Sequence, residues 1–387
     1  MTIKRSKHLS TNLNHPQKVE LKAGNAPLNS PIYQSAKFDI SQDSYSEQFI
    51  YSRVSNPTLR ELELTLAEVQ GQEDCIVLAS GMAAVAGVLL GLLRSGDHVI
   101  SFRETYKPAR IFIRETLKNF GVTSSILQMS DLKNIEAAII PEKTKIIYFE
   151  SPSNPNLSVG DISELKKIAQ EHNLLLILDG TFAGLHQHTD MGIDLIVQSL
   201  TKFANGHGDL IAGSIAGSKK LISQIRSMTT SLGATLDPHT AFMVQRGLKT
   251  YDLRYGKQTT SSLKIAQFLE SHPKVKRVYY PGLKSHPEFA LAQRQMKDMG
   301  AIVSFELAAD SKINALEFCH KVKLFHFTVS VGSTESLINP TQTFFAEDLS
   351  PQDRLEMGLS PYSLRLSIGL EHEDDLIADL NEVLSLA

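Results

Sequence analysis

The sequence predicts an α/β fold, with a large domain built on a mostly parallel β-sheet covered by helices and a smaller C-terminal α/β domain. Through its first two thirds, short apolar runs alternate with amphipathic helical patterns such as DISELKKIAQEH (161–172). This alternation is typical of a parallel sheet that is buried on both faces. The expected strands of that sheet are HVISF (98–102), KIIYF (145–149), LLLIL (174–178), LIVQSL (195–200) and LIAGSIAG (210–217).

The pattern changes near residue 250, where we place a domain boundary. Residues 1–50 are polar and irregular and predict an N-terminal arm, residues 51–250 predict the large domain, and residues 251–387 predict the small one. In the small domain the strands are partly polar, as in a sheet with one open face. Its expected strands are 274–282, 301–307, 323–332 and 363–370, and its expected helices are 261–273, 314–322 and 373–386.

Composition excludes several functional classes. The 387 residues are 42% hydrophobic and 21% charged, with a net charge of −3, which gives no field that favours nucleic acid or anionic lipid. The uncharged run CIVLASGMAAVAGVLLGLL (75–93) is long enough to span a bilayer, but its Ser-Gly pair favours a buried strand, a turn and a buried helix. The two cysteines lie in apolar runs and predict free thiols in a reducing compartment, so we expect a cytoplasmic protein.

Chemically active residues follow several of the expected strands. Ligands of open parallel sheets bind beyond the carboxyl ends of the strands. CIVLA is followed by Ser80 and Gly81 at the expected start of a helix, and LLLIL is followed by Asp179. The other strands of this sheet deliver Tyr106, Glu150, Ser199, Thr201 and Lys202 to the same edge.

Each of these residues has an ordinary structural explanation when it is taken alone. Lysines are mostly solvated, an Asp after a strand is usually a helix cap, and an arginine such as Arg365 on a half-open strand is usually solvated. Taken together, they match what pyridoxal 5'-phosphate requires: a lysine for its aldehyde, an acid for its ring nitrogen and a helix N-terminus for its phosphate. Lys202, Asp179 and Gly81 are the candidates for these three tasks.

Other classes of protein are less well supported. A nicotinamide dehydrogenase would carry G-x-G-x-x-G between an early strand and helix, and GHGDLIAG (206–213) has the wrong spacing. His186-Gln187-His188 is a weak metal motif that we interpret as a solvated loop, and no metal site is expected. A catalytically inactive binding protein would not need Lys202 and Asp179.

The sequence also resembles the transsulfuration, or Cys/Met metabolism, family of pyridoxal-phosphate enzymes. The resemblance covers nearly the whole chain and rests on SPIYQSAKF, YSRVSNPT, ASGMAA, ESPSNPN, SLTKFANGHGD, RGLKT, HPKVKRVYYPGLKSHP and LRLSIGLE. It implies fold type I, with the cofactor in the large domain, and a homo-oligomer that is at least a dimer and usually a tetramer. It implies no membrane or nucleic-acid partner.

The resemblance assigns roles to matching positions. Lys202 would hold the cofactor and move protons, assisted by Tyr106, which would stack on the ring, or by Tyr51. Asp179 would pair with the ring nitrogen, and Asn154 would contact both the cofactor and the substrate. The phosphate would be held by Gly81, Met82, Ser199 and Thr201, and by Tyr51 and Arg53 of a neighbouring subunit; the substrate carboxylate would be held by Asn154, Ser330 and Arg365.

Three positions depart from the family pattern. Gly180 stands where the family commonly has Asn, Lys107-Pro108-Ala109 replaces Gly-Gly-Thr, and Phe344-Phe345 replaces Thr-His. None of these changes removes a catalytic group. Each is expected to reshape the substrate pocket.

Local features favour one reaction within the family. Tyr106-Lys107-Pro108 resembles the Tyr-x-Pro of bacterial cystathionine β-lyases, as do DGTFAG and IGLE, and Val329 stands where many γ-synthases and γ-lyases have Glu. The first hypothesis is therefore a carbon–sulfur lyase that converts cystathionine into homocysteine, pyruvate and ammonia in methionine biosynthesis. A cystathionine γ-synthase or γ-lyase activity, including a methionine γ-lyase activity, remains the alternative.

Overall fold

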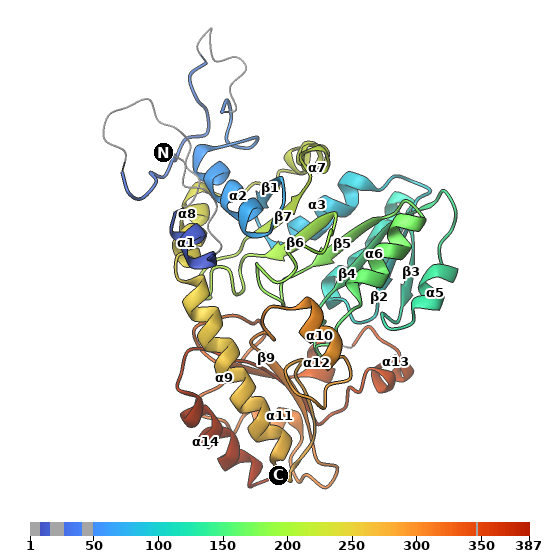
Figure 1. The fold of residues 1–387 in the computed structure, drawn as a ribbon, viewed down its shortest axis with the longest axis vertical. Helices are drawn as coiled ribbons and strands as arrows, with labels where there is room; N and C mark the ends of the chain where they lie inside the picture. Colours follow the sequence, from blue (N-terminus) through green and yellow to red (C-terminus); the bar gives the residue numbers. More distant parts are fainter. Residues whose placement is uncertain (1–7, 16–26, 41–48, 346) are drawn as a thin grey trace.

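The computed structural model describes residues 8–15, 27–40, 49–345 and 347–387, and two sheets organise them (Figure 1). The larger sheet has seven strands in the order β1-β7-β6-β5-β4-β2-β3. Strand β7 is antiparallel to β1 and β6, and the other four pairings are parallel. The strands are β1 (Asp74–Leu78), β2 (His98–Phe102), β3 (Thr123–Leu127), β4 (Thr144–Glu150), β5 (Leu175–Asp179), β6 (Leu195–Ser199) and β7 (Gly213–Gly217).

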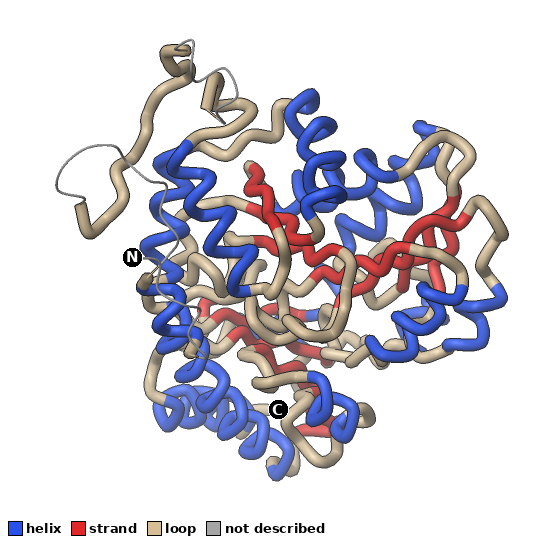
Figure 2. The backbone as a smooth tube through the Cα atoms, turned by 45° about the horizontal axis from the view of Figure 1, so that its top comes forward, coloured by secondary structure: helices blue, strands red, loops and turns tan. Residues whose placement is uncertain are grey.

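Helices cover both faces of this sheet, as Figure 2 shows. One face packs against α3 and α7, which contribute Val88 and Ile225 to a shared core with the strands, and the other face packs against α6 through Leu165. The predicted mostly parallel sheet with helices on both faces is confirmed. The helical segments of this part are α2 (Pro57–Val69), α3 (Gly81–Leu92), α4 (Lys107–Ile111), a π-helical turn (Phe112–Thr116), a 3₁₀ turn (Leu117–Phe120), α5 (Leu132–Ala137), α6 (Ile162–Glu171), α7 (Lys219–Leu232) and α8 (Pro238–Leu248).

The apolar run 75–93 folds into the predicted strand, turn and helix. Strand β1 ends at Leu78, and the side chain of Ser80 caps α3 by accepting a hydrogen bond from the backbone N–H of Ala83 at 3.0 Å. Helix α3 has only 12 residues. Among the described residues, no helix has the length and apolar character needed to cross a membrane.

A smaller five-stranded sheet, in the order β10-β11-β12-β9-β8, forms the second part of the molecule. It is antiparallel apart from the β10–β11 pair, and α9, α11 and α14 pack against it. The strands are β8 (Val275–Tyr279), β9 (Ile302–Leu307), β10 (His326–Phe327), β11 (Leu337–Pro340) and β12 (Ser363–Ser367). The helices are α9 (Tyr251–Ser271), α10 (Phe289–Gln295), α11 (Ala315–Cys319), α12 (Thr341–Phe345), α13 (Pro351–Glu356) and α14 (Glu373–Leu384).

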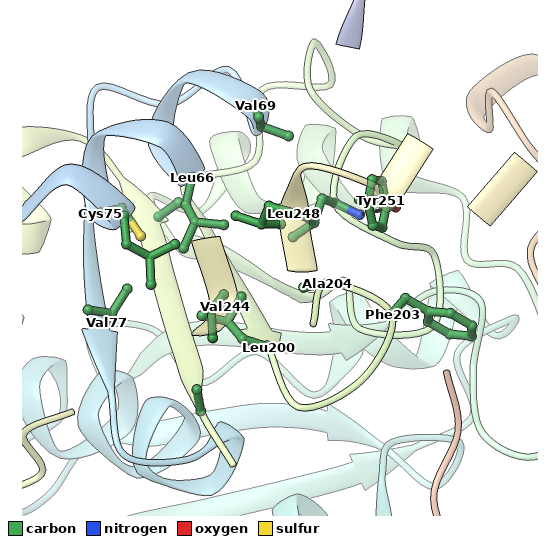
Figure 3. Close-up of a cluster of buried hydrophobic side chains, with 14 of the residues drawn as sticks. Leu66, Val69, Cys75, Val77, Leu200, Phe203, Ala204, Val244, Leu248 and Tyr251 are labelled. Carbon is green, nitrogen blue, oxygen red and sulfur yellow. Dashed lines mark hydrogen bonds between the residues drawn. The ribbon is translucent and has the colours of Figure 1, made fainter. Parts of the chain in front are cut away.

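Helix α9 links the two parts (Figure 1). Its first turns bury Tyr251 and Tyr255 in the core formed with α2 and α8, and its later turns bury Ile265 and Leu269 in the core of the small sheet. Figure 3 shows Tyr251 near Leu248 and Phe203 in the first of these cores. Because α9 contributes to both cores, the boundary at residue 250 stays a prediction.

Two expectations about local structure were wrong. The segment 323–332 was expected to be one strand, but only His326–Phe327 pairs, and Ser330 has a positive φ of 100°, which is not a strand conformation. The arm was expected to be irregular, yet α1 (Leu9–Asn14) is helical and buries Leu13 in the core. The N-terminal run KRSKH (4–8) is basic, and most of it lies outside the described residues.

Candidate active site

The ends of β4, β5 and β6 bring three polar side chains to one edge of the large sheet. Glu150 is paired with Asp179 in register, and Ser199 follows on the next strand. Asp179 is buried, and burial raises the pKa of its carboxyl group. Its Oδ1 accepts hydrogen bonds from the backbone N–H (3.1 Å) and the hydroxyl (2.6 Å) of Thr181. Its Oδ2 accepts one from the Tyr148 hydroxyl at 3.2 Å, so the carboxylate is fixed in orientation and can still accept a further donor.

Lys202 lies three residues beyond the end of β6, and its amine is partly withdrawn from solvent. The Nζ atom donates a hydrogen bond to the Ser330 hydroxyl oxygen at 2.6 Å. Burial, reinforced by the positive charge of Arg365, lowers the pKa of Lys202 to about 8. The amine is therefore neutral far more often than an exposed lysine, so a larger fraction of it can act as a nucleophile or accept a proton near neutral pH.

Ser330 connects Lys202 with Arg365. Its backbone has a φ of 100°, a region that non-glycine residues rarely occupy and that costs energy to maintain. The Ser330 carbonyl accepts a hydrogen bond from Nη2 of Arg365 at 2.9 Å, while Nη1 of Arg365 donates to Oδ1 of Asn154 at 2.8 Å. Lys202, Ser330, Arg365 and Asn154 thus form one hydrogen-bonded group drawn from both parts of the molecule.

The guanidinium of Arg365 is buried rather than solvated, which contradicts the ordinary explanation of this residue. It is 2% exposed and lies 4.3 Å from the Phe345 ring centre and 5.6 Å from that of Phe182. Burial lowers its pKa, and the negative charge of Glu150 opposes that shift. Its Nε atom is buried and has no hydrogen-bond partner among the described side chains and backbone. A cation held in this way can bind a carboxylate that enters the site.

The start of α3 forms a cradle suited to an anion. A Cβ atom on Gly81 would lie 2.8 Å from Cβ of Ser199, and one on Gly213 would lie 2.2 Å from the carbonyl oxygen of Ser80. Only glycine allows this close approach, which leaves backbone N–H groups of the helix start available. Met82 lies in the first turn and is half-buried. The Thr201 hydroxyl oxygen accepts a hydrogen bond from the Ala212 backbone N–H at 3.0 Å.

Tyr106 lies at the start of α4, beside the buried carboxylates. Its backbone N–H donates to Oε2 of Glu150 at 2.7 Å, and its side chain is 38% exposed. Burial and the neighbouring charge of Asp179 raise the pKa of Glu150 well above its usual range. The ring of Tyr106 is free to contact a ligand on its exposed face.

Tyr51 and Arg53 lie apart from this group. Tyr51 is 44% exposed and forms an isolated backbone bridge with Lys37. The Arg53 guanidinium donates to the Thr230 carbonyl oxygen at 3.3 Å and lies 5.4 Å from the centre of the Tyr51 ring. Within one described chain they contact the arm, α7 and Thr235, whose hydroxyl donates to the Arg53 carbonyl oxygen at 3.4 Å.

The structure shows which residues contact the three positions that depart from the family pattern. A Cβ on Gly180 would lie 2.7 Å from Nε2 of Gln198, so an Asn at this position requires Gln198 to move. Lys107 forms an ion pair with Glu347 at 2.7 Å, and Ala109, which lies within α4, is fully buried. The ring of Phe345 contacts Arg365, while the side chain of Phe344 lies outside the described atoms.

Several supporting residues escaped sequence reasoning. Thr181 and Tyr148 orient Asp179, and Phe182 flanks Arg365. Phe345, which was expected only as a departure from the family pattern, also flanks Arg365. Thr181 could have been found, because a Thr two residues after an Asp often closes a local turn. The others carry no local signal, since their partners are distant in sequence.

The His186-Gln187-His188 segment is not the solvated loop that we expected. Nε2 of His186 lies 3.0 Å from Oδ2 of Asp298. His188 is 5% exposed, and its Nε2 lies 3.3 Å from the Ser151 carbonyl oxygen. The described residues contain no group of three or more His, Cys, Asp or Glu side chains that could hold a metal ion.

These features fit a pyridoxal-phosphate enzyme of fold type I. Lys202, with its lowered pKa, is suited to react with an aldehyde. The oriented carboxylate of Asp179 is suited to a cationic ring nitrogen, and the glycine cradle at Gly81 is suited to a phosphate. Bound pyridoxal phosphate supplies an aldehyde that links to an amine and a ring that accepts electrons from the substrate's α-carbon. A cationic ring nitrogen beside Asp179 would also stabilise that buried carboxylate.

Comparison with known proteins identifies the family. The model of the Cys/Met metabolism PLP-dependent enzymes matches residues 11–385, and the chain belongs to this family. Its cofactor is pyridoxal phosphate, and it is an enzyme of the carbon–sulfur lyase and synthase type.

Relatives of known activity differ in the reaction that they catalyse. The chain is 38% identical to L-methionine gamma-lyase of Pseudomonas putida, over 92% of each chain, and 36% identical to cystathionine beta-lyase of Lactococcus lactis, over 92% of this chain and 93% of that enzyme. It is 38% identical to cystathionine gamma-synthase 1 of Arabidopsis thaliana, over 89% of this chain but only 61% of that protein's length. The solved structure of cystathionine gamma-lyase from Lactobacillus plantarum, complexed with L-serine, superposes with a TM-score of 0.92 at 34% identity, over 98% of both chains.

The lowered pKa of Lys202 predicts how the apoenzyme regains its cofactor. With a pKa of about 8 rather than 10.5, roughly a tenth of the amine is neutral at pH 7, about 300-fold more than for an unperturbed lysine. We expect the rate of cofactor attachment, followed by visible absorption, to rise about tenfold per pH unit below pH 8 and to level off above it. A rate that still rises tenfold per unit at pH 9.5 would show that the amine is not perturbed.

Proposed function

We propose that this enzyme cleaves the carbon–sulfur bond of a sulfur amino acid, with cystathionine β-elimination as the first candidate reaction. The observation that carries the proposal is the hydrogen-bonded group formed by Lys202, Ser330, Arg365 and Asn154, next to Asp179. It places a proton-transferring amine beside a buried guanidinium that can hold an α-carboxylate. The α-carbon of a substrate held in this way faces the base that must deprotonate it.

The proposed roles follow from these positions. Arg365 and Asn154 bind the substrate carboxylate, with the Ser330 carbonyl fixing the guanidinium. Lys202 holds the cofactor and then moves a proton at the substrate's α-carbon, and its partner at 2.6 Å, the Ser330 hydroxyl, orients the amine. Asp179 holds the ring nitrogen, and Tyr106 covers the ring. The phosphate contacts are the start of α3, with Gly81 and Met82, and the hydroxyls of Ser199 and Thr201.

The choice of β-elimination is supported by local features around this group. Pro108 follows Tyr106 at the start of α4 in the Tyr-x-Pro arrangement, and Val329, which precedes Ser330, is 52% exposed and places no acid there. The cystathionine beta-lyase of Lactococcus lactis is among the relatives at 36% identity. The sulfur then leaves as homocysteine, and the remaining carbons leave as pyruvate with ammonia.

The second candidate is γ-elimination of an apolar thioether such as methionine. Val329 offers an apolar surface at the position that would face the distal end of the substrate, and the Pseudomonas putida L-methionine gamma-lyase is 38% identical. The same lysine can remove the additional proton at Cβ that this reaction requires. Small changes in the pocket therefore separate the two outcomes.

The keto acid that is formed distinguishes the two candidates. We expect purified holoenzyme incubated with cystathionine to give pyruvate and homocysteine, and to give little 2-oxobutyrate or methanethiol with methionine. Both keto acids can be identified by chromatography after derivatisation. 2-Oxobutyrate without pyruvate would reject β-elimination, and methanethiol from methionine would establish the second candidate.

We also propose a homo-oligomer that is at least a dimer. Each chain would consist of an N-terminal arm (1–50), a large domain (51–250) and a small domain (251–387). Tyr51 and Arg53 are exposed and lie away from Lys202 in one chain, which suits a role at the phosphate of a neighbouring subunit. Sedimentation of the holoenzyme would show the assembly. Restored cofactor binding on mixing Arg53→Ala with Lys202→Ala protein would show that the two residues serve one site from different chains.

A further inference from the structure

Arg110 is a fully buried cation that the proposed chemistry does not use. It lies in α4, four residues after Tyr106, and is 1% exposed. Its Nε and Nη2 atoms donate to the two carboxylate oxygens of Asp348 at 2.9 and 2.6 Å, in a bidentate ion pair. Such a pair is geometrically specific because the planar guanidinium matches the carboxylate.

The remaining donors of Arg110 hold two backbone segments. Nη1 donates to the carbonyl oxygens of Arg103 and Thr105 at 2.5 and 2.7 Å, and Nη2 donates to the carbonyl oxygen of Phe345 at 3.2 Å. All five guanidinium N–H groups are therefore occupied. One side chain ties the strand exit before Tyr106 to the end of α12.

The end of α12 is the segment that places Phe345 against Arg365. The Phe345 ring centre lies 4.3 Å from the Arg365 guanidinium carbon, within the range of a cation–π contact. This contact matters because the guanidinium is otherwise desolvated and its Nε has no partner in the described structure. The position of the Phe345 backbone thus affects the orientation of the Arg365 guanidinium.

Other ion pairs join the same two segments but are more exposed. Arg103 pairs with Asp353 and Glu356, whose side chains are 36% and 42% exposed, and Lys107 pairs with Glu347, which is 63% exposed. Asp348 is only 9% exposed. Exposed pairs contribute little, so the Arg110–Asp348 pair is the contact expected to fix this segment.

We propose that Arg110 is a positioning residue for substrate recognition: through Asp348 and the Phe345 carbonyl it holds the Phe345 ring against Arg365 and so sets the affinity for the substrate carboxylate. This inference rests on the proposed role of Arg365 as the carboxylate ligand. It assigns a specificity function to a residue that never touches the substrate. Phe345 is one of the two residues that depart from the family pattern at 344–345, and Arg110 would be the residue that holds it in place.

The test measures carboxylate affinity separately from turnover. The dissociation constant of L-alanine, which has the α-carboxylate but no sulfur leaving group, is measured with holoenzyme from the change in its visible absorption. We expect Arg110→Lys to raise this constant roughly tenfold, because a lysine cannot replace the bidentate pair and three carbonyl contacts. The KM for the sulfur substrate should rise in parallel while kcat changes less than about threefold.

A matched control separates positioning from stability. Arg226 on α7 forms a similar bidentate pair with Glu63 on α2, at 3.0 and 2.9 Å, away from Arg365. Arg226→Lys should lower the midpoint of thermal unfolding without changing the L-alanine constant. If Arg110→Lys fails to fold, Asp348→Asn, which keeps one acceptor oxygen, takes its place in the same measurement.

A double-mutant cycle with Phe345→Leu locates the effect. If Arg110 acts through Phe345, the double variant binds L-alanine no more weakly than the weaker single variant, whereas independent effects would multiply and overturn the proposal. An Arg110→Lys variant with reduced stability and an unchanged constant would also overturn it. The Arg365→Lys variant distinguishes failure of the proposed role of Arg365 from failure of this inference. If its dissociation constant for L-alanine is unchanged, both proposals are refuted. If Arg365→Lys binds L-alanine more weakly but Arg110→Lys binds it normally, only this inference is refuted.

Discussion

Replacing Lys202 by Ala is expected to abolish turnover and the visible absorption of the covalently held cofactor. The physical reason is that the proposed function gives one amine two tasks, which are to hold the cofactor and to transfer protons at the substrate's α-carbon. Its lowered pKa, about 8, and its 2.6 Å hydrogen bond to the Ser330 hydroxyl suit it to both. We expect kcat to fall by about 10⁴-fold or more.

The measurement needs a lysine control and a check on folding. Lys220 is exposed on α7, and Lys220→Ala should retain both the absorption and the activity of the parent enzyme. Circular dichroism should show that Lys202→Ala is folded, since it removes a half-buried charge rather than core packing. A Lys202→Ala protein that keeps the visible band and normal turnover would refute the assignment of this lysine.

Replacing Asp179 by Asn is expected to lower kcat by about 10³-fold with a smaller effect on cofactor affinity. The Asn side chain is nearly isosteric and can keep the hydrogen bonds from Thr181, whose hydroxyl lies 2.6 Å from Oδ1. It cannot stabilise a cation at the ring nitrogen, so the ring becomes a poorer acceptor of electrons from the α-carbon. The loss should therefore appear in the deprotonation step, as slowed exchange of the α-proton into deuterated solvent.

Asp190 provides the matched control for this substitution. It is exposed, and Asp190→Asn should leave both kcat and α-proton exchange unchanged. Because burial raises the pKa of Asp179, its carboxylate is destabilised in the apoenzyme, and Asp179→Asn should not reduce the thermal stability of the apoenzyme. An Asp179→Asn enzyme that exchanges the α-proton at the parent rate would contradict the role proposed for this carboxylate.

Most strands of the large sheet were predicted closely because their signal is local, although β3 (Thr123–Leu127) was not expected. HVISF was expected at 98–102, and β2 runs from His98 to Phe102. A short, nearly continuous apolar run is typical of a parallel strand that is buried on both faces. Asp179 and Lys202 were found for the same reason, because Asp179 directly follows one such run and Lys202 comes two residues after another. The strands of the small sheet were predicted less well. β11 (Leu337–Pro340) was not expected, because a short strand between polar residues shows no hydrophobic periodicity.

The surroundings of Arg365 could not be predicted from the sequence. Arg365 alternates with apolar neighbours on β12 and would be solvated if that face were open, yet it is buried beneath Phe345 and Phe182. The covering residues lie on other elements, and their approach depends on how the two sheets meet. The bidentate pair of Arg110 with Asp348 could not be predicted either, because the two residues are 238 positions apart in the chain.

By itself the sequence determined the α/β class, most of the large-sheet strands and the chemical groups that follow them, because apolar periodicity and strand-exit residues are properties of short segments. Only the tertiary structure decided that Ser330 lies between Lys202 and Arg365, that burial lowers the pKa of the lysine, and that Arg110 donates a hydrogen bond to the Phe345 carbonyl oxygen. Those features depend on burial and on distances between remote segments, which arise when the small sheet packs against the edge of the large one.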